Sequence, residues 1–329
     1  MGPDPGPDMM AIARPTAAAR EEADEPPASV MPFGRRVRLA RRGTTFVRQL
    51  DGPPGAPTLL LLHGWAATGG LNWFRVFGPL SSRFSVVAPD LRGHGRGLRS
   101  RRPFRLAAVA DDCAATILEL GTGPVIPVGY SMGGPVAQLL WRRHRDLVAG
   151  LVLCATGSCF LTAQRERIVF TSMIAAAMGG TRVGAAAAWV PGLAGRAVAR
   201  RLPAPGSFPA WSAAEFRRHD WRHLMEAGHA IGTYDSRRWI GSVDVPTAVL
   251  VTTRDRAVPP ERQFEMAMSI PGATIHRVDG GHTVCATDGL AAPLVEACSA
   301  VEERARRAGF VLGNGPPGSG AGAARPVRG

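Results

Sequence analysis

The stretch PVIPVGYSMGG, residues 124–134, decides the fold of this chain. It contains the pattern Gly-x-Ser-x-Gly with Ser131 at its centre. The apolar run before Gly129 is typical of a short buried strand, and the apolar residues within 136–141 predict a helix. A serine in a sharp turn between a strand and a helix is held in a strained conformation that exposes its hydroxyl. Ser131 is therefore a candidate nucleophile.

Two candidate partners of Ser131 lie later in the chain, each just after a predicted strand. The apolar, β-branched run 247–253 leads to Asp255. The next such run, 273–278, leads to His282. Because the carboxyl ends of parallel strands meet at one edge of a sheet, we expect both side chains to reach the serine hydroxyl. The order Ser, Asp, His predicts that Asp255 orients His282, which accepts the serine proton.

A serine that attacks a carbonyl also needs N–H donors near the oxygen that becomes negative. The residue after the serine, Met132, supplies one candidate donor from its backbone. The loop after another predicted strand, 58–62, carries the second candidate, the backbone N–H of Trp65. These two positions form the predicted oxyanion hole.

The chain holds other acids and histidines that bear on such a site. Asp90 follows a predicted strand and is the alternative acid for orienting the histidine, whereas Asp279 is more typical of a turn. His276 lies inside a predicted strand and is expected to be structural, and His63 and His94 belong to turn motifs that shape loops. The remaining histidines lie on polar helical segments and are expected at the surface: His144, His219, His223 and His229.

Taken together, these motifs resemble those of the α/β-hydrolase superfamily, over about residues 35–310. The resemblance rests on His63-Gly64-Trp65, Asp90-Leu91-Arg92-Gly93-His94-Gly95, the Ser131 turn, Asp255 with Val258-Pro259, and Gly281-His282. It implies an α/β fold, with a mostly parallel eight-stranded sheet flanked by helices and a helical cap inserted after the sixth strand. It also implies a serine hydrolase of the esterase or lipase type, which needs no metal or organic cofactor.

The motifs specify the superfamily far better than they specify the substrate, because one fold hosts many reactions. Hydrolysis of a carboxylic ester with an apolar acyl group, through an acyl-enzyme intermediate, is the first expectation. Other reactions that use the same serine triad remain open: C–C bond hydrolysis, cofactor-free perhydrolysis, acyl transfer and lyase chemistry. A non-catalytic module that binds a ligand is a further alternative.

Strands that alternate with helical segments predict a sheet covered by helices on both faces. Residues 31–159 and 241–312 are assigned to the hydrolase core, and residues 160–240 to the cap. Residues 1–30 and 313–329 are rich in Pro, Ala and Gly and are expected to be disordered. The eight predicted strands lie near residues 36–40, 44–50, 58–62, 84–89, 125–130, 149–154, 247–253 and 273–278.

The expected cap supplies the candidate wall of an acyl pocket. Segments 168–178, 183–190 and 211–231 are expected to be helical. An apolar wall would suit an apolar acyl chain better than a sugar or a nucleotide. The candidate residues are Met173, Ile174, Met178, Trp189, Leu193 and Trp211.

The formal net charge is +13, and all 39 basic residues are arginine. No aromatic-basic motif accompanies this charge, so nucleic acid is not an expected partner. One arginine cluster follows a strand end on the side of the predicted site. It is expected either to place an acidic substrate or a lipid surface, which would allow peripheral membrane contact, or to be a solvated loop. Its members are Arg92, Arg96, Arg99, Arg101, Arg102 and Arg105.

The five cysteines are scattered and odd in number, which argues against a disulfide framework or a zinc site. Cys113 and Cys154 fall in apolar segments and are expected to fill space in the core. Unpaired cysteines are typical of a reducing compartment, so a cytoplasmic location is expected. No window holds 18 uncharged apolar residues, so no membrane-spanning segment is expected, and residues 1–30 do not resemble a secretory signal.

Overall fold

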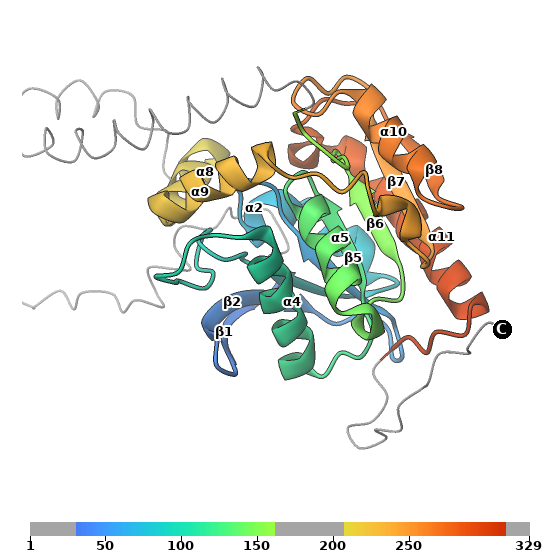
Figure 1. Ribbon diagram of the computed structural model, residues 1–329. Helices are drawn as coiled ribbons and strands as arrows, with labels where there is room; N and C mark the ends of the chain where they lie inside the picture. The colour runs from blue at the N-terminus through green and yellow to red at the C-terminus, as the bar shows by residue number, and fades with distance from the viewer. Residues whose placement is uncertain (1–30, 162–206, 314–329) are drawn as a thin grey trace, which may run out of the picture.

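The computed structural model of the protein describes residues 31–161 and 207–313. A sheet of eight strands forms its centre (Figure 1): Gly34–Leu39 (β1), Gly43–Leu50 (β2), Thr58–Leu62 (β3), Ser85–Pro89 (β4), Ile126–Tyr130 (β5), Leu151–Cys154 (β6), Thr247–Thr252 (β7) and Thr274–Val278 (β8). Their order across the sheet is β1-β2-β4-β3-β5-β6-β7-β8.

The sheet is mostly parallel. Strand β2 pairs antiparallel with β1 and with β4, and every other neighbouring pair is parallel. The predicted fold class is therefore confirmed, and the predicted strand ends differ from the observed ones by no more than two residues.

Helices cover both faces of this sheet. They span Gly69–Trp73 (α2), Phe77–Ser81 (α3), Leu106–Leu120 (α4), Gly133–Arg143 (α5), Pro260–Ser269 (α10) and Ala291–Arg307 (α11), with short 3-10 helices at Arg145–Leu147, Ile240–Ser242, Val284–Ala286 and Asp288–Leu290. Helices α4, α5 and α10 share one hydrophobic core with the sheet, and α2, α3 and α11 share the other. Figure 1 shows α4 and α5 packed side by side over one face.

Strand β3 shows how the sequence builds these two cores. All five of its residues, TLLLL, are buried, because helices lie on both sides of it. Leu60 and Leu62 belong to the core that contains α4 and α5, whereas Leu59 and Leu61 belong to the core that contains α3 and α11. Successive side chains of a strand point to opposite faces, so a central strand needs apolar residues at every position.

Two further helices, Phe208–Arg217 (α8) and Trp221–Gly232 (α9), lie between β6 and β7 in the sequence. They run close together near α2 (Figure 1). The sequence predicted one helical segment over 211–231, and the structure divides it. The side chain of Asp220 accepts a hydrogen bond from the backbone N–H of His223, which starts a new helix at Trp221.

The predicted helices at 168–178 and 183–190 lie outside the described residues, as do five of the six candidate pocket residues. The sixth, Trp211, is 2% exposed. Its ring packs against Phe74 and Phe208 at centroid distances of 5.5 and 5.8 Å. Trp211 therefore lies in the packed interface between α8 and the end of α2.

The arginine cluster within residues 92–105 is only partly exposed. Arg92 pairs with Asp112 at 2.7 Å, and Arg96 pairs with Glu215 at 3.2 Å. All four side chains are less than 10% exposed. The expectation of a solvated loop or an anion-binding loop is wrong for Arg92 and Arg96, because carboxylates of the same chain already neutralise them.

The expectation that His219 and His223 lie at the surface is also wrong, since they are 6% and 0% exposed. The Nδ1 atom of His219 accepts a hydrogen bond of 2.9 Å from the backbone N–H of Gly95. The Nε2 atom of His223 lies 3.1 Å from the carbonyl oxygen of Arg102. Both imidazoles face the loop 92–105, so α8 and α9 dock on that loop through buried polar contacts.

The cysteines follow the sequence expectation. Cys113 and Cys154 are 2% and 0% exposed and belong to the two hydrophobic cores. All five cysteines are free thiols. Burial raises the pKa of Cys113, so this thiol stays protonated and acts as a small apolar side chain.

Candidate active site

Ser131 lies in the turn between β5 and α5. Its backbone φ is +51°, in the left-handed region that a residue with a Cβ seldom adopts. The neighbouring glycines make the turn possible. A Cβ at Gly133 would overlap the carbonyl group of Leu62, and one at Gly129 would overlap the carbonyl group of Gly133. The turn therefore needs glycine on both sides of the serine for steric reasons.

The structure brings the three residues of the predicted triad together. The Ser131 hydroxyl oxygen lies 2.9 Å from Nε2 of His282, and Nδ1 of His282 lies 2.8 Å from Oδ2 of Asp255. The Asp255 carboxylate is completely buried, whereas the His282 side chain is 28% exposed. The imidazole thus joins a buried acid to a serine and is itself partly exposed.

Asp255 is held as an anion by its surroundings. Its Oδ1 atom accepts hydrogen bonds from the backbone N–H groups of Ala257 and Val258, at 2.8 and 2.9 Å. Its Oδ2 atom accepts one from the hydroxyl of Thr252 as well as lying against His282. Burial by itself raises the pKa of this carboxyl, but the hydrogen bonds from His282, Val258 and Thr252 outweigh burial and lower the pKa below its ordinary value.

The loop that carries Trp65 lies beside the serine. A Cβ at Gly64 would stand 3.4 Å from Cβ of Ser131. The side-chain oxygen of Asn72 fixes this loop by accepting a 3.0 Å hydrogen bond from the backbone N–H of Gly64. Met132, the other predicted donor, is completely buried at the start of α5. The first turn of a helix adds partial positive charge at this place.

His63 and Asp90, the other polar groups near this loop, have structural partners. The Nε2 atom of His63 accepts from the N–H of Leu91, so the proton sits on Nδ1, which donates to the carbonyl of Gly64. Burial lowers the pKa of His63 to about 4, so the ring is neutral near pH 7. Asp90 accepts from the N–H groups of Gly69 and Arg96 rather than facing His282.

The sequence did not single out two residues that hold the site in shape. Asn72 anchors the loop beside Ser131, and Tyr130 donates a hydrogen bond of 2.6 Å to the carbonyl of His282. Tyr130 occupies the first variable position of the Gly-x-Ser-x-Gly pattern. Its place directly before Ser131 was the one sequence feature that could have pointed to a role in the site.

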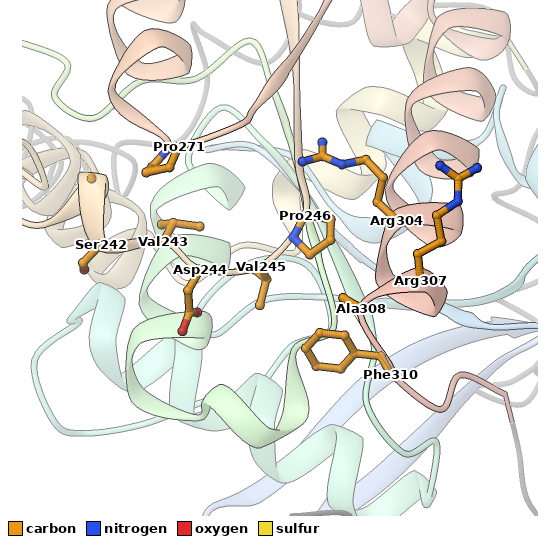
Figure 2. A pocket seen from close by; sticks show the side chains of 11 residues that line it. Ser242, Val243, Asp244, Val245, Pro246, Pro271, Arg304, Arg307, Ala308 and Phe310 are labelled. Atoms are coloured by element: carbon orange, nitrogen blue, oxygen red, sulfur yellow. The ribbon is translucent and has the colours of Figure 1, made fainter. Parts of the chain in front are cut away.

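A cavity of about 960 Å³ lies beside the amino ends of β7 and β8 (Figure 2). Pro246 and Pro271, which line it, precede the amino ends of β7 and β8. Arg304 and Phe310, near the end of α11, form its other wall. Ser131 follows the carboxyl end of its strand, so this cavity is separate from the candidate active site.

The described part of the chain offers neither a metal site nor a membrane-spanning helix. Among residues 31–161 and 207–313, no group of three or more His, Cys, Asp or Glu side chains is arranged to hold a metal ion. Within the same ranges, no helix is both long enough and apolar enough to cross a membrane.

Comparisons with known proteins agree with this fold. The magnesium-chelatase 30 kDa subunit of Rhodobacter capsulatus is 29% identical over 273 residues, which cover 74% of this chain and 88% of that protein. Lipase LipV of Mycobacterium tuberculosis is 37% identical over 127 residues, so this chain spans about half of the lipase (47%) and the match covers 39% of this chain. The solved structure of a thermophilic esterase from Thermogutta terrifontis is 25% identical, with a TM-score of 0.63, over 83% of this chain and 99% of that one.

A family model decides the classification. The model described as the alpha/beta hydrolase family matches residues 59–296, which is more than half of the chain and includes the Ser131 turn, Asp255 and His282. The chain belongs to the alpha/beta hydrolase family.

Proposed function

We propose that this protein is a serine hydrolase that cleaves a carboxylic ester through an acyl-enzyme intermediate. One observation carries the proposal: the unbroken series of contacts from Ser131 through His282 to Asp255, at 2.9 and 2.8 Å. A serine, a histidine and a buried acid in this order form the arrangement that activates a serine hydroxyl. The strained backbone of Ser131 adds support, because strain of this kind gathers at functional positions.

In the first half of the proposed reaction, the Ser131 oxygen attacks the ester carbonyl while His282 takes the serine proton. Asp255 holds the imidazole in the tautomer that presents Nε2 to the serine, and it stabilises the positive charge that develops. The backbone N–H groups of Trp65 and Met132 donate to the oxyanion, and each such donor lowers the barrier by roughly 3 kcal/mol. The tetrahedral intermediate then expels the alcohol, which takes the proton from His282.

In the second half, a water molecule attacks the acyl-enzyme. His282 accepts one proton of that water, and the same pair of N–H donors stabilises the second tetrahedral intermediate. Collapse of this intermediate returns the proton to Ser131 and releases the carboxylic acid. These steps use groups of the chain and water alone.

Two relatives support an ester as the substrate, since one is named a lipase and the other an esterase. The proposed cap, residues 160–240, is rich in apolar residues, which favours an apolar acyl group. The proposed substrate is therefore a small or lipid-like ester. The five free cysteines favour a reducing compartment, and the proposed location is the cytoplasm.

The test is hydrolysis of p-nitrophenyl esters from acetate to palmitate, with Ser131→Ala as the matched variant. Turnover in the wild-type protein that disappears in Ser131→Ala is the expected result, and the preferred chain length reports the size of the acyl pocket. Labelling of the serine by a fluorophosphonate, without turnover of any ester, would indicate an active nucleophile that serves another reaction, such as C–C bond hydrolysis, perhydrolysis or acyl transfer.

A second candidate comes from the Rhodobacter capsulatus relative, which aligns over 88% of its own length. That relative is named a subunit of magnesium chelatase, which favours a non-catalytic role as a binding module or subunit. The same experiment separates the two, because a non-catalytic module would show neither ester turnover nor fluorophosphonate labelling. A ligand that raises the melting temperature without being converted would then support the second candidate.

A further inference from the structure

Tyr130 is the last residue of β5 and directly precedes Ser131. It is 2% exposed, and its backbone lies opposite Cys154 of the parallel neighbour β6. A residue in the middle of a sheet has little freedom to move, so the direction of its side chain is set by the strand. Tyr130 therefore has a fixed position relative to the serine that follows it.

The Tyr130 phenol contacts the backbone of His282. Its hydroxyl donates a hydrogen bond of 2.6 Å to the carbonyl oxygen of His282, which is at the short end of the normal range for O–H···O bonds. The two residues are 152 positions apart in the sequence. This bond thus helps to tie the loop after β8 to the strand that carries the nucleophile.

The loop around His282 shows why a side chain is needed here. The carbonyl of Gly280 accepts from the backbone N–H of Arg254, and the carbonyl of Gly281 accepts from that of Val284. The next carbonyl, that of His282, receives a hydrogen bond from a side chain instead. Because buried backbone groups require partners, the phenol takes the place that a backbone N–H fills for the two preceding residues.

The Tyr130 ring is itself held in place on two sides. It meets the ring of Trp73 edge-on at 6.0 Å and lies 5.9 Å from the imidazole of His282. Burial raises the pKa of Tyr130, so the hydroxyl keeps its proton and remains a donor throughout the working range of pH. The hydrogen bond to the His282 carbonyl therefore does not depend on pH within this range.

We propose that Tyr130 is a positioning residue, which holds the main chain of His282 so that its Nε2 atom faces the Ser131 hydroxyl. The inference rests on the proposed function. Asp255 fixes the ring of His282, and Tyr130 fixes its backbone, so the imidazole is constrained from two directions. Tyr130 and Ser131 are adjacent. The end of β5 therefore holds both the nucleophile and the hydrogen bond that fixes the backbone of His282.

The test compares Tyr130→Phe with Tyr234→Phe. The chain has two tyrosines, and Tyr234 is also buried, with its hydroxyl 2.9 Å from the side-chain oxygen of Gln138. Each variant removes one buried phenol hydroxyl and leaves the ring. The pair therefore separates loss of a hydrogen bond in general from loss of this particular one.

Ester hydrolysis is measured first. We expect Tyr130→Phe to lower kcat on the order of tenfold with KM changed less than twofold, because small misplacement of a catalytic group slows the chemical step. We expect Tyr234→Phe to keep kcat within twofold of the wild-type value. Equal kcat values for the two variants would overturn the proposal.

A second measurement does not depend on turnover. The Nδ1–H resonance of His282 is identified by proton NMR from its loss in His282→Gln. We expect it to be sharp in the wild-type protein and in Tyr234→Phe, and to broaden or disappear in Tyr130→Phe. A sharp, unshifted resonance in Tyr130→Phe would overturn the proposal. If the wild-type protein hydrolyses no ester and takes no fluorophosphonate, the proposed function fails, and this resonance still tests the position of the histidine.

Discussion

The indole nitrogen of Trp65 donates a hydrogen bond of 2.7 Å to the backbone carbonyl of Leu224 in α9. Trp65 belongs to the loop beside Ser131, and its backbone is a proposed oxyanion donor. Helix α9 makes other bonds to the core as well: its Glu226 side chain accepts from the N–H of Phe104 at 2.6 Å. The described part of the inserted segment is thus joined to the wall of the candidate active site.

Trp65→Phe tests this link between α9 and the loop. The variant keeps the backbone N–H and most of the ring but loses the indole donor. We expect the free energy of unfolding to fall by about 1 kcal/mol, the usual worth of one hydrogen bond. We also expect kcat for ester hydrolysis to fall several-fold, because the loop loses one of its anchors.

The control is Trp141→Phe. Its indole nitrogen donates to Asp244 at 3.1 Å, beside the cavity at the far end of the sheet. This variant should lose stability without a selective loss of kcat. A Trp65→Phe protein whose kcat matches that of Trp141→Phe would show that the hydrogen bond from Trp65 to Leu224 does not support the reaction.

The backbone strain at Ser131 predicts a difference between two inactive variants. Ser131→Ala and Ser131→Gly both remove the hydroxyl, but alanine keeps a Cβ at φ +51° and glycine does not. We expect Ser131→Gly to be more stable than Ser131→Ala by about 1 kcal/mol, since the left-handed region costs a residue with a Cβ about that much. Urea unfolding of the two proteins measures the difference. Equal stabilities would mean that the turn is not strained.

Because Glu215 is buried between two arginines, we expect a large loss of stability when its charge is removed. Its carboxylate is 2% exposed, lies 3.2 Å from both Arg96 and Arg218, and accepts a hydrogen bond from Thr68. Glu215→Gln removes the charge that balances these guanidinium groups. We expect a loss of about 3 kcal/mol in the free energy of unfolding, as for other buried ion pairs that lose one partner.

The matched control for Glu215→Gln is Glu303→Gln. Glu303 pairs with Arg83 and Arg307 at 3.7 and 3.8 Å, and it is 54% exposed. Exposed pairs of this kind contribute about 0–1 kcal/mol. Thermal or urea unfolding of both variants should give clearly unequal losses, and similar losses would contradict the buried role of Glu215.

Buried histidines predict that the protein loses stability in mild acid. Burial lowers the pKa of His63 and of His219 from 6.5 to about 4. The folded state therefore keeps both rings neutral, while the unfolded chain binds protons below pH 6.5. Stability is fully present above pH 6.5 and declines as the pH falls towards 4. Between pH 7 and pH 5 we expect a loss of about 2 kcal/mol for each of these histidines.

Urea unfolding at pH 7 and pH 5 measures this loss. The variant His219→Gln should reduce the difference between the two pH values by about 2 kcal/mol, because glutamine does not titrate. A wild-type protein with equal stability at both pH values would show that these imidazoles do not titrate as their burial implies.

The sequence by itself determined the sheet and the positions at which site residues would be found. Apolar runs such as TLLLL at 58–62 specify central strands, because only a strand covered on both faces is apolar at every position. Ser131 and Asp255 each follow such a strand, and His282 follows the edge strand β8. Parallel strands end at one edge, so local patterns were enough to predict that these three residues would meet.

The tertiary structure alone decided how the polar residues around the site are used. Arg92 and Arg96 lie in a stretch dense in arginine, and His219 and His223 lie on polar helical segments, so their local patterns resemble those of exposed positions. Arg96, His219 and His223 are buried because α8 and α9 dock on the loop 92–105 through polar contacts between residues more than 100 positions apart. Arg92 is buried against Asp112 of α4.

The physical reason for this difference is that local periodicity predicts which residues form a hydrophobic core. It does not predict which polar residues form a buried interface. A charged or polar side chain is buried only when a specific partner compensates for its lost hydration. The identity of that partner depends on which loops and helices meet in space. The same holds for Tyr130, whose function follows from the carbonyl of His282 that the fold brings within 2.6 Å of its hydroxyl.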